Sequence, residues 1–406
     1  MPPGESATEF ALSPGGKEVA FVVRGEVFVT STEFNTTRRI TDTPEQERSV
    51  SFSPDGRSLL YAGERDGSWN VYESSLVDED ELYFFSATKI EEMPIVATDA
   101  DEFQPAYSPD GEKVAYLHER SEIRVLDTES GATVTALPGD AFYSYADGDH
   151  WFEFSPDGRW LAVQIYNRDR VFYGEVGLVP ADGSGGVVDV SHSGYDDIAP
   201  RFTVWGGALI WATDRYGERS HGSWGAEYDV VAAFLTQDAF DHFRLSKEEY
   251  ELQKELEEKK EKDADDETEE SGENGDEDGV ADDAGDDEDE EEKEEQAEPV
   301  EIEFDGLDTR RARLTIHASD LGDFAMSPEC DKLYYLARFE KGYDLWVHEF
   351  RESSTKILAK LGAGDAAMEL SEDGESLLVL ADGSLTKIET GDGERKGIGF
   401  AAEMTV

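Results

Sequence analysis

The sequence is poor in cysteine, in long apolar runs and in positive charge. Its single cysteine, Cys330, excludes an internal disulfide and a metal cluster built from cysteines. No apolar run approaches the roughly 20 residues that span a bilayer, and no cationic, apolar-cored signal segment follows Met1. We therefore expect a soluble protein in the cytoplasm, or in the periplasm if an export signal has been removed.

Positive charge is scarce, because 36 Lys and Arg face 95 Asp and Glu in 406 residues, a formal net charge of −59. Such a surface repels nucleic acid and anionic membranes, so neither is expected as a partner. Residues 251–300 hold 27 acidic and 5 basic side chains, but the rest of the chain is acidic too. An acidic surface with only 15 Lys against 21 Arg favours a halophilic protein, in which concentrated salt screens self-repulsion. An ordinary acidic protein is the alternative.

Seven copies of one short motif are spread over the chain, most of them centred on Ser-Pro. The copies are FALSPGG (10–16), VSFSPDG (50–56), PAYSPDG (105–111), FEFSPDG (152–158), RFTVWGG (201–207), AMSPECD (325–331) and MELSEDG (368–374). Their anchoring hydroxyl residues recur about every 45 residues, apart from one insertion of roughly 75 residues. The anchors are Ser13, Ser53, Ser108, Ser155, Thr203, Ser327 and Ser371.

Each copy predicts the same local structure. An apolar-alternating strand ends at Ser-Pro, because proline cannot donate a ladder hydrogen bond, and Asp-Gly then closes a hairpin, because glycine supplies a positive φ. Four antiparallel strands at this period predict an all-β fold, a seven-bladed β-propeller that spans residues 1–406 as a single domain. The expected blades are approximately 4–44, 45–99, 100–140, 141–195, 196–320, 321–363 and 364–406.

Blade five carries the insertion. Ser246 and Glu249 form a capping box inside an expected helical insertion at 238–262. Residues 263–298 are almost wholly Asp, Glu, Gly, Ala, Ser and Asn, so we expect this acidic tract to be disordered. The closing strand of blade five is expected at 300–304, continuing to 314. The last strand of the chain, near 398–402, either completes blade seven alone or pairs with the N-terminal strand.

Motifs for catalysis or cofactor binding are missing. No G-x-S-x-G elbow, P-loop or Rossmann glycine pattern occurs. The Ser-Pro serines recur once per blade, which favours a structural role, and the seven histidines show no metal-ligand spacing. We assign no catalytic residue, no metal and no cofactor from the sequence.

One segment of blade five stands apart from the repeat: DRYGERSHGSWG at 214–225. Two guanidiniums near an aromatic ring can clamp a peptide carboxylate. The predicted peptide contacts are therefore Arg215, Arg219, His221 and Trp224. The alternative is a long hairpin that supports a neighbouring blade, with its arginines paired to local acids.

The Ser-Pro-Asp-Gly hairpins resemble the propeller repeats of TolB and the tricorn peptidases. The string WATDRYGERSHGSWGAEYDVVAAFLTQDAFDHFRLSKEEY at 211–250 makes the resemblance more specific. Together with the charged insertion and VEIEFDGLDTRRARLT at 300–315, it is similar to the seven-bladed propeller of tricorn-like serine peptidases of the S41 type. This resemblance covers essentially the whole chain.

The resemblance implies a function. In that family a six-bladed propeller precedes the seven-bladed one, and a PDZ domain and the peptidase core with its catalytic residues follow. No catalytic residue can be carried over to this chain. The implied role is a channel or filter that passes oligopeptides to the downstream peptidase domains, within a homo-oligomer. A free-standing TolB-like interaction propeller, or a propeller enzyme with its own channel site, are the alternatives.

Overall fold

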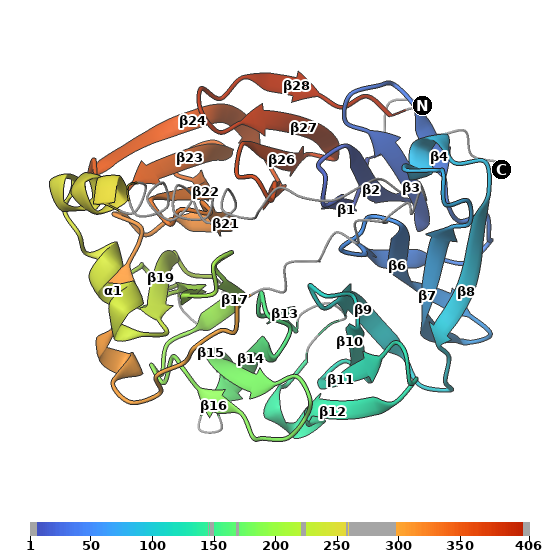
Figure 1. The fold of residues 1–406 in the computed structure, drawn as a ribbon, viewed down its shortest axis with the longest axis horizontal. Coiled ribbons are helices and arrows are strands. Elements are labelled where there is room, and N and C mark those ends of the chain that lie inside the picture. The colour runs from blue at the N-terminus through green and yellow to red at the C-terminus, as the bar shows by residue number, and fades with distance from the viewer. Residues whose placement is uncertain are drawn as a thin grey trace, which may run out of the picture.

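The computed structural model describes residues 6–144, 146, 150–167, 170–220, 225–256, 259 and 298–400. Its strands form seven four-stranded antiparallel sheets arranged in a ring, which confirms the predicted seven-bladed β-propeller (Figure 1). In every sheet the four strands follow one another in sequence, and the first strand of each blade lies innermost. The division of residues 1–406 into blades at the limits given above is kept as a proposal.

The strands of blades one to four are β1 (Glu9–Leu12), β2 (Glu18–Val23), β3 (Glu26–Ser31), β4 (Thr37–Arg39), β5 (Glu47–Phe52), β6 (Ser58–Arg65), β7 (Ser68–Leu76), β8 (Ile90–Val96), β9 (Glu102–Tyr107), β10 (Lys113–His118), β11 (Glu122–Asp127), β12 (Thr133–Leu137), β13 (Phe152–Phe154), β14 (Trp160–Asn167), β15 (Arg170–Pro180) and β16 (Val188–Asp189). Those of blades five to seven are β17 (Asp197–Phe202), β18 (Ala208–Thr213), β19 (Asp229–Phe234), β20 (Arg311–Arg313), β21 (Asp320–Met326), β22 (Lys332–Arg338), β23 (Tyr343–Glu349), β24 (Ser354–Ala363), β25 (Ala366–Leu370), β26 (Ser376–Ala381), β27 (Ser384–Glu389) and β28 (Arg395–Gly397).

The predicted hydroxyl holds the hairpin between the first two strands of each blade. In blade four, Ser155 is fully buried, and its Oγ accepts a hydrogen bond from Trp160 N at 2.9 Å and donates one to Asp157 Oδ1 at 2.5 Å. Gly158 in this turn has a φ of 65°, which a side chain would strain. The same bond from the amide five residues later, at 2.8–3.2 Å, is accepted by Ser13, Ser53, Ser108, Thr203, Ser327 and Ser371. The repeat is therefore a structural one.

One polar side chain from each innermost strand reaches the backbone of the next blade. These seven residues, here called the axial ring, are Glu9, Ser51, Gln104, Glu153, Arg201, Asp323 and Glu369. Each lies two or four residues before the hairpin hydroxyl. Glu153 Oε1, for example, accepts Phe202 N at 2.9 Å. Burial raises the pKa of Glu153, and likewise that of Glu369, to about 7.

Blade seven meets blade one without sharing a strand among the residues described. The last strand expected near 398–402 is instead β28 at Arg395–Gly397, and it completes blade seven by pairing with β27. The chain leaves the sheet after β28 because Ile398 packs into the apolar cluster between the two blades, and the Phe400 ring lies 4.5 Å from that of Phe21. Leu12 N also donates to Glu369 Oε2 at 3.0 Å across this junction.

The helical insertion is broken in two. Helix α1 (Gln237–Phe243) packs on blade five, with the Phe243 ring 4.6 Å from that of Phe234. A second helix covers 247–256, and the predicted capping box begins it, because Ser246 N donates to Glu249 Oε2 at 2.9 Å. The acidic tract expected to be disordered, 263–298, lies outside the described residues except for Glu298.

The closing strand of blade five does not begin at 300–304 as expected, and the strand that is found lies within the predicted continuation to 314. The segment 300–304 runs beside the sheet, where Val300 and Ile302 pack on the apolar cluster between blades four and five, and Val300 N donates to Asp157 Oδ2 at 2.7 Å. Blade five is closed by β20, which pairs with β19. No helix among the described residues is long and apolar enough to cross a membrane.

Candidate functional site

The loop between β18 and β19 holds the predicted peptide contacts. It leaves the sheet after Thr213 and returns at Asp229, with a short bridge between Arg219 and Ala226. Arg215 and Arg219 can be placed, whereas His221 and Trp224 lie outside the described residues.

Arg219 is bound by neighbours within the protein. Its guanidinium donates to the carboxylate of Asp214, whose side chain is only 5% exposed, and to the Tyr173 hydroxyl at 3.3 Å. It also lies over the Tyr173 and Tyr195 rings, at 5.1 and 5.0 Å from their centroids. This is the local pairing that the alternative interpretation expects, so a peptide contact by Arg219 stays a prediction.

Two acidic residues, the buried Asp214 and the half-buried Asp196, lie next to Arg219 and are linked by hydrogen bonds. Asp214 Oδ1 accepts Asp196 N at 2.9 Å, and Asp196 in turn accepts Gly174 N at 2.8 Å and the Tyr228 hydroxyl at 2.7 Å. Burial raises the pKa of Asp196 and that of Tyr228. Arg219 is the guanidinium that balances this acidic group.

Arg215 has different surroundings. Its guanidinium carbon lies 5.5 and 5.6 Å from the ring centroids of Tyr195 and Tyr216, and it forms no ion pair with any residue that the structure describes. It lines a pocket on the face of blade five that is turned toward blade four. Six residues that matter to its chemistry line this pocket: Asp197, Trp211, Arg215, Tyr216, Arg311 and Arg313.

Two of these pocket residues, Arg311 and Arg313, were missed by the sequence reasoning. Arg313 is neutralised, because its Nε and Nη2 both bind Asp229 Oδ1, at 2.9 and 2.8 Å. Arg311 donates to backbone carbonyls of blade four, at 2.8 Å to Ser191 and 2.6 Å to Val190. Burial lowers the pKa of Arg311. The basic run at 310–313 in a strongly acidic chain is the signal that could have identified them.

The pocket therefore holds two guanidiniums, those of Arg215 and Arg311, without a carboxylate partner among the described residues. Asp197 also lines this pocket and is 1% exposed; its Oδ2 accepts a hydrogen bond from Ser193, its Oδ1 has no hydrogen-bond partner, and its charge attracts Arg311. The two guanidiniums, one exposed on Arg215 and one half-buried on Arg311, suit an anion with planar, bidentate geometry, such as a carboxylate.

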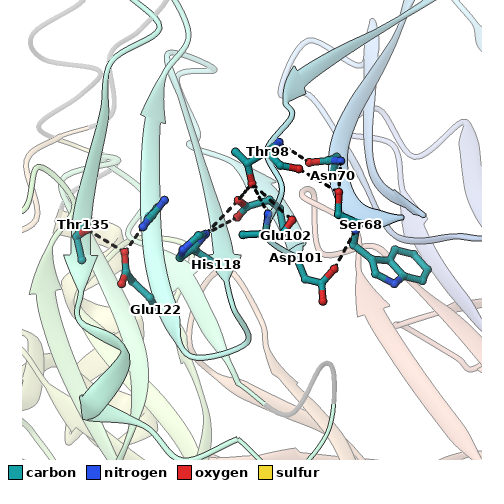
Figure 2. A network of polar contacts seen from close by, with 11 residues as sticks. Ser68, Asn70, Thr98, Asp101, Glu102, His118, Glu122 and Thr135 are labelled. Atoms are coloured by element: carbon teal, nitrogen blue, oxygen red, sulfur yellow. Dashed lines mark hydrogen bonds and ion pairs between the residues drawn. The ribbon is translucent and has the colours of Figure 1, made fainter. Parts of the chain in front are cut away.

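At the corresponding end of blade three the polar side chains bind one another, as Figure 2 shows. Glu102, at the start of the innermost strand, is fully buried and accepts hydrogen bonds from Thr98 Oγ1 at 2.8 Å. Its carboxylate also lies 3.0 Å from Nδ1 of His118, at the end of the second strand. Further out, Glu122 accepts Arg124 Nε at 2.6 Å. No group of three or more His, Cys, Asp or Glu among the described residues is arranged to hold a metal ion.

The sequence matches no protein-family model and none of the curated proteins compared with it. Solved structures share its fold. The tricorn protease superposes with a TM-score of 0.64 and 12% identity, over 97% of this chain and 34% of that one. A puromycin-hydrolysing peptidase from Mycobacterium tuberculosis gives 0.56 and 14%, over 97% and 53%. Oligogalacturonate lyase from Vibrio parahaemolyticus gives 0.56 and 11%, over 98% and 91%.

At these identities the likeness concerns the fold alone, and the fold occurs in peptidases and in a lyase. This chain spans about a third of the length of the tricorn protease and about half of the mycobacterial peptidase. The fold expected from the sequence resemblance is thus confirmed: the chain is a seven-bladed β-propeller similar to part of the tricorn protease.

Proposed function

We propose that this chain is the non-catalytic propeller region of a tricorn-like serine peptidase. It binds oligopeptides and passes them toward a peptidase domain of the same polypeptide, for which it also serves as a scaffold. The fold likeness to the tricorn protease over 97% of the chain supports this proposal, as do the sequence motifs of blade five. The PDZ domain, the peptidase core and a homo-oligomer are proposed partners on the same grounds.

The observation that carries the proposal is the unpaired Arg215 guanidinium. In a protein with a net charge of −59, Arg215 forms no ion pair with a carboxylate among the described residues, and it lines a pocket together with a second such arginine, Arg311. Arg215 is exposed and lies near two tyrosine rings, so its hydrogen-bond donors are available to a ligand. The carboxylate of an oligopeptide is the ligand that this arrangement favours.

The test is direct binding of fluorescently labelled oligopeptides to the full chain, followed by anisotropy. Arg215→Ala should weaken binding by about tenfold or more, because one charge-assisted contact contributes roughly that factor. The matched control is Arg338→Ala in blade six, since Arg338 also lies over a tyrosine, at 5.0 Å from the Tyr343 ring, but is paired with Asp320. The control should bind peptides as the original chain does.

Two results would count against the proposal. If no oligopeptide binds, the chain is not a peptide-binding propeller. If the isolated chain hydrolyses peptides and one serine substitution abolishes the hydrolysis, it is a propeller enzyme with its own catalytic site.

A further inference from the structure

Blade two contains an internal counterpart of the pocket between blades four and five. The pairing register aligns the two blades, because Phe52 pairs with Leu59 in blade two as Phe202 pairs with Leu209 in blade five. Counting forward from these leucines, Tyr61 and Trp211 occupy the same position of the second strand. By the same count Arg215 corresponds to Arg65, although Arg65 is the last residue of β6 and Arg215 lies in the loop two residues after β18.

The outer strands extend this correspondence. In blade two, Leu59 pairs with Ser74 and Ser74 with Glu92. In blade five, Leu209 pairs with Ala233 and Ala233 with Arg311. The position that carries a carboxylate in blade two thus carries a guanidinium in blade five.

In blade two the carboxylate is bound by the two equivalent donors. The Tyr61 hydroxyl donates to Glu92 Oε2 at 2.5 Å, and Arg65 Nη2 donates to the same oxygen at 2.9 Å while Nη1 binds the other. Burial disfavours the charge on this carboxylate, yet the hydrogen bonds from Arg65 and Tyr61 lower the pKa of Glu92. The tyrosine hydroxyl and the guanidinium therefore form a complete carboxylate-binding arrangement.

In blade five the donors are present but their acceptor is missing. Trp211 is 2% exposed, and its indole Nε1 has no hydrogen-bond partner in the structure. Arg311 Nε likewise has none, as is also true of Arg65 Nε in blade two, and the exposed Arg215 makes no ion pair with the described residues. Buried donors without an acceptor are rare, and two guanidiniums that line one pocket repel each other. Asp197, which lines the same pocket and whose Oδ1 has no hydrogen-bond partner, attracts Arg311, so Trp211 Nε1 and the exposed Arg215 are the donors for which the chain provides no carboxylate.

We propose that the pocket binds the carboxylate group of an external ligand at the place that the Glu92 carboxylate has in blade two. Trp211, Arg215 and Arg311 are the donors, and Arg313 is not, because Asp229 already neutralises it. Two sources share this chemistry: the C-terminus of an oligopeptide and a small free carboxylic acid. The peptide source rests on the proposed function, whereas the site itself does not.

The ligand-side experiment titrates the full chain with N-acetyl-tetra-alanine as the free acid, with its C-terminal amide, and with acetate. The indole N–H resonance of Trp211, identified by its loss in Trp211→Phe, reports binding at the pocket. The free acid should bind about ten to a hundred times more tightly than the amide, because only the acid offers charge-assisted hydrogen bonds. Tighter binding of the tetrapeptide acid than of acetate supports the peptide source, and binding of acetate alone supports the small acid.

The second experiment changes the protein, by placing in blade five a carboxylate at the position that Glu92 has in blade two. Arg311→Glu supplies the missing carboxylate from within the chain, so Arg215 and Trp211 should bind it and the advantage of the acid over the amide should disappear. Because Arg311 also holds the blade-four backbone, this variant can fail to fold. Arg215→Ala in the loop is the second variant, with the same expected loss, and Arg338→Ala is the control that should keep the advantage.

The outcomes separate this site from the proposed function. Equal affinities for acid and amide overturn the carboxylate site and leave the peptide-binding function standing. Binding of acetate without any peptide supports the site and overturns the peptide-binding function. Absence of binding by all three probes overturns both. If Arg215→Ala and Arg311→Glu still bind the free acid more tightly than the amide, the carboxylate site is overturned as well.

Discussion

Replacing one carboxylate of the axial ring tests how the propeller depends on pH. Glu153 lies between blades four and five, where its Oε1 accepts Phe202 N at 2.9 Å, and burial raises its pKa to about 7. An unfolded glutamate has a pKa of about 4.3. The folded state therefore holds the proton more strongly, and the free energy of unfolding falls as pH rises from about 4 to about 7. Glu153→Gln keeps the oxygen acceptor but has no proton to lose.

The expected size follows from the pKa difference. The difference between a pKa of about 7 and one of about 4.3 corresponds to about 3–4 kcal/mol, and because Glu153 is partly exposed we expect about 1–3 kcal/mol. Relative to the original chain, Glu153→Gln should therefore gain about 1–3 kcal/mol of unfolding free energy between about pH 5 and about pH 8. This difference in unfolding free energy arises because the original chain loses stability over this pH interval, whereas the variant does not.

Urea denaturation followed by tryptophan fluorescence at a series of pH values, with the salt concentration held constant, measures the effect. The matched control is Glu112→Gln, which removes an exposed carboxylate from a hairpin turn and should leave the pH dependence of the original chain unchanged. Parallel stability curves for Glu153→Gln and the original chain across this interval would refute the reasoning. Glu369→Gln repeats the experiment at the junction of blades seven and one.

Three further perturbations have expected outcomes that denaturation can check. Ser155→Ala leaves a buried amide without its acceptor and should lower the free energy of unfolding by about 1–3 kcal/mol, whereas exposed Ser184→Ala should change it little. Arg219→Ala strips buried Asp214 of its cation and should destabilise the fold by about 1–3 kcal/mol, against less than about 1 kcal/mol for Arg338→Ala; equal effects would contradict the pairing. If the acidic surface is adapted to salt, stability should rise steadily from about 0.1 M to about 3 M NaCl, and full stability near zero salt would show an ordinary acidic protein.

The fold could be predicted from the sequence because one local hydrogen-bond pattern recurs in every blade. The buried hydroxyl that satisfies an amide five residues later fixes the hairpin of every blade, so seven anchors predicted seven sheets. The axial ring also left a signal, since its members lie two or four residues before each anchor. The closing strand of blade five was misplaced because Val300 and Ile302 have the alternation of a strand, and only packing against the neighbouring blade decides that they lie beside the sheet.

The candidate site was only partly predictable for a related reason. Arg215 was found because it lies in a loop that interrupts the repeat. Arg311 lies about a hundred residues later, beyond the insertion, and its relation to Arg215 depends on strand register. The comparison of Glu92 with Arg311 needs that register in both blades, which the strand patterns do not determine when closing strands are short and irregular.

A crystal structure of the full chain with N-acetyl-tetra-alanine acid would show whether the pocket binds a peptide carboxylate. We expect the terminal carboxylate to lie between blades four and five, within hydrogen-bond distance of Arg215 and Trp211, with the peptide leading out past Tyr216. A peptide bound elsewhere on the propeller, with the pocket holding only water, would contradict it.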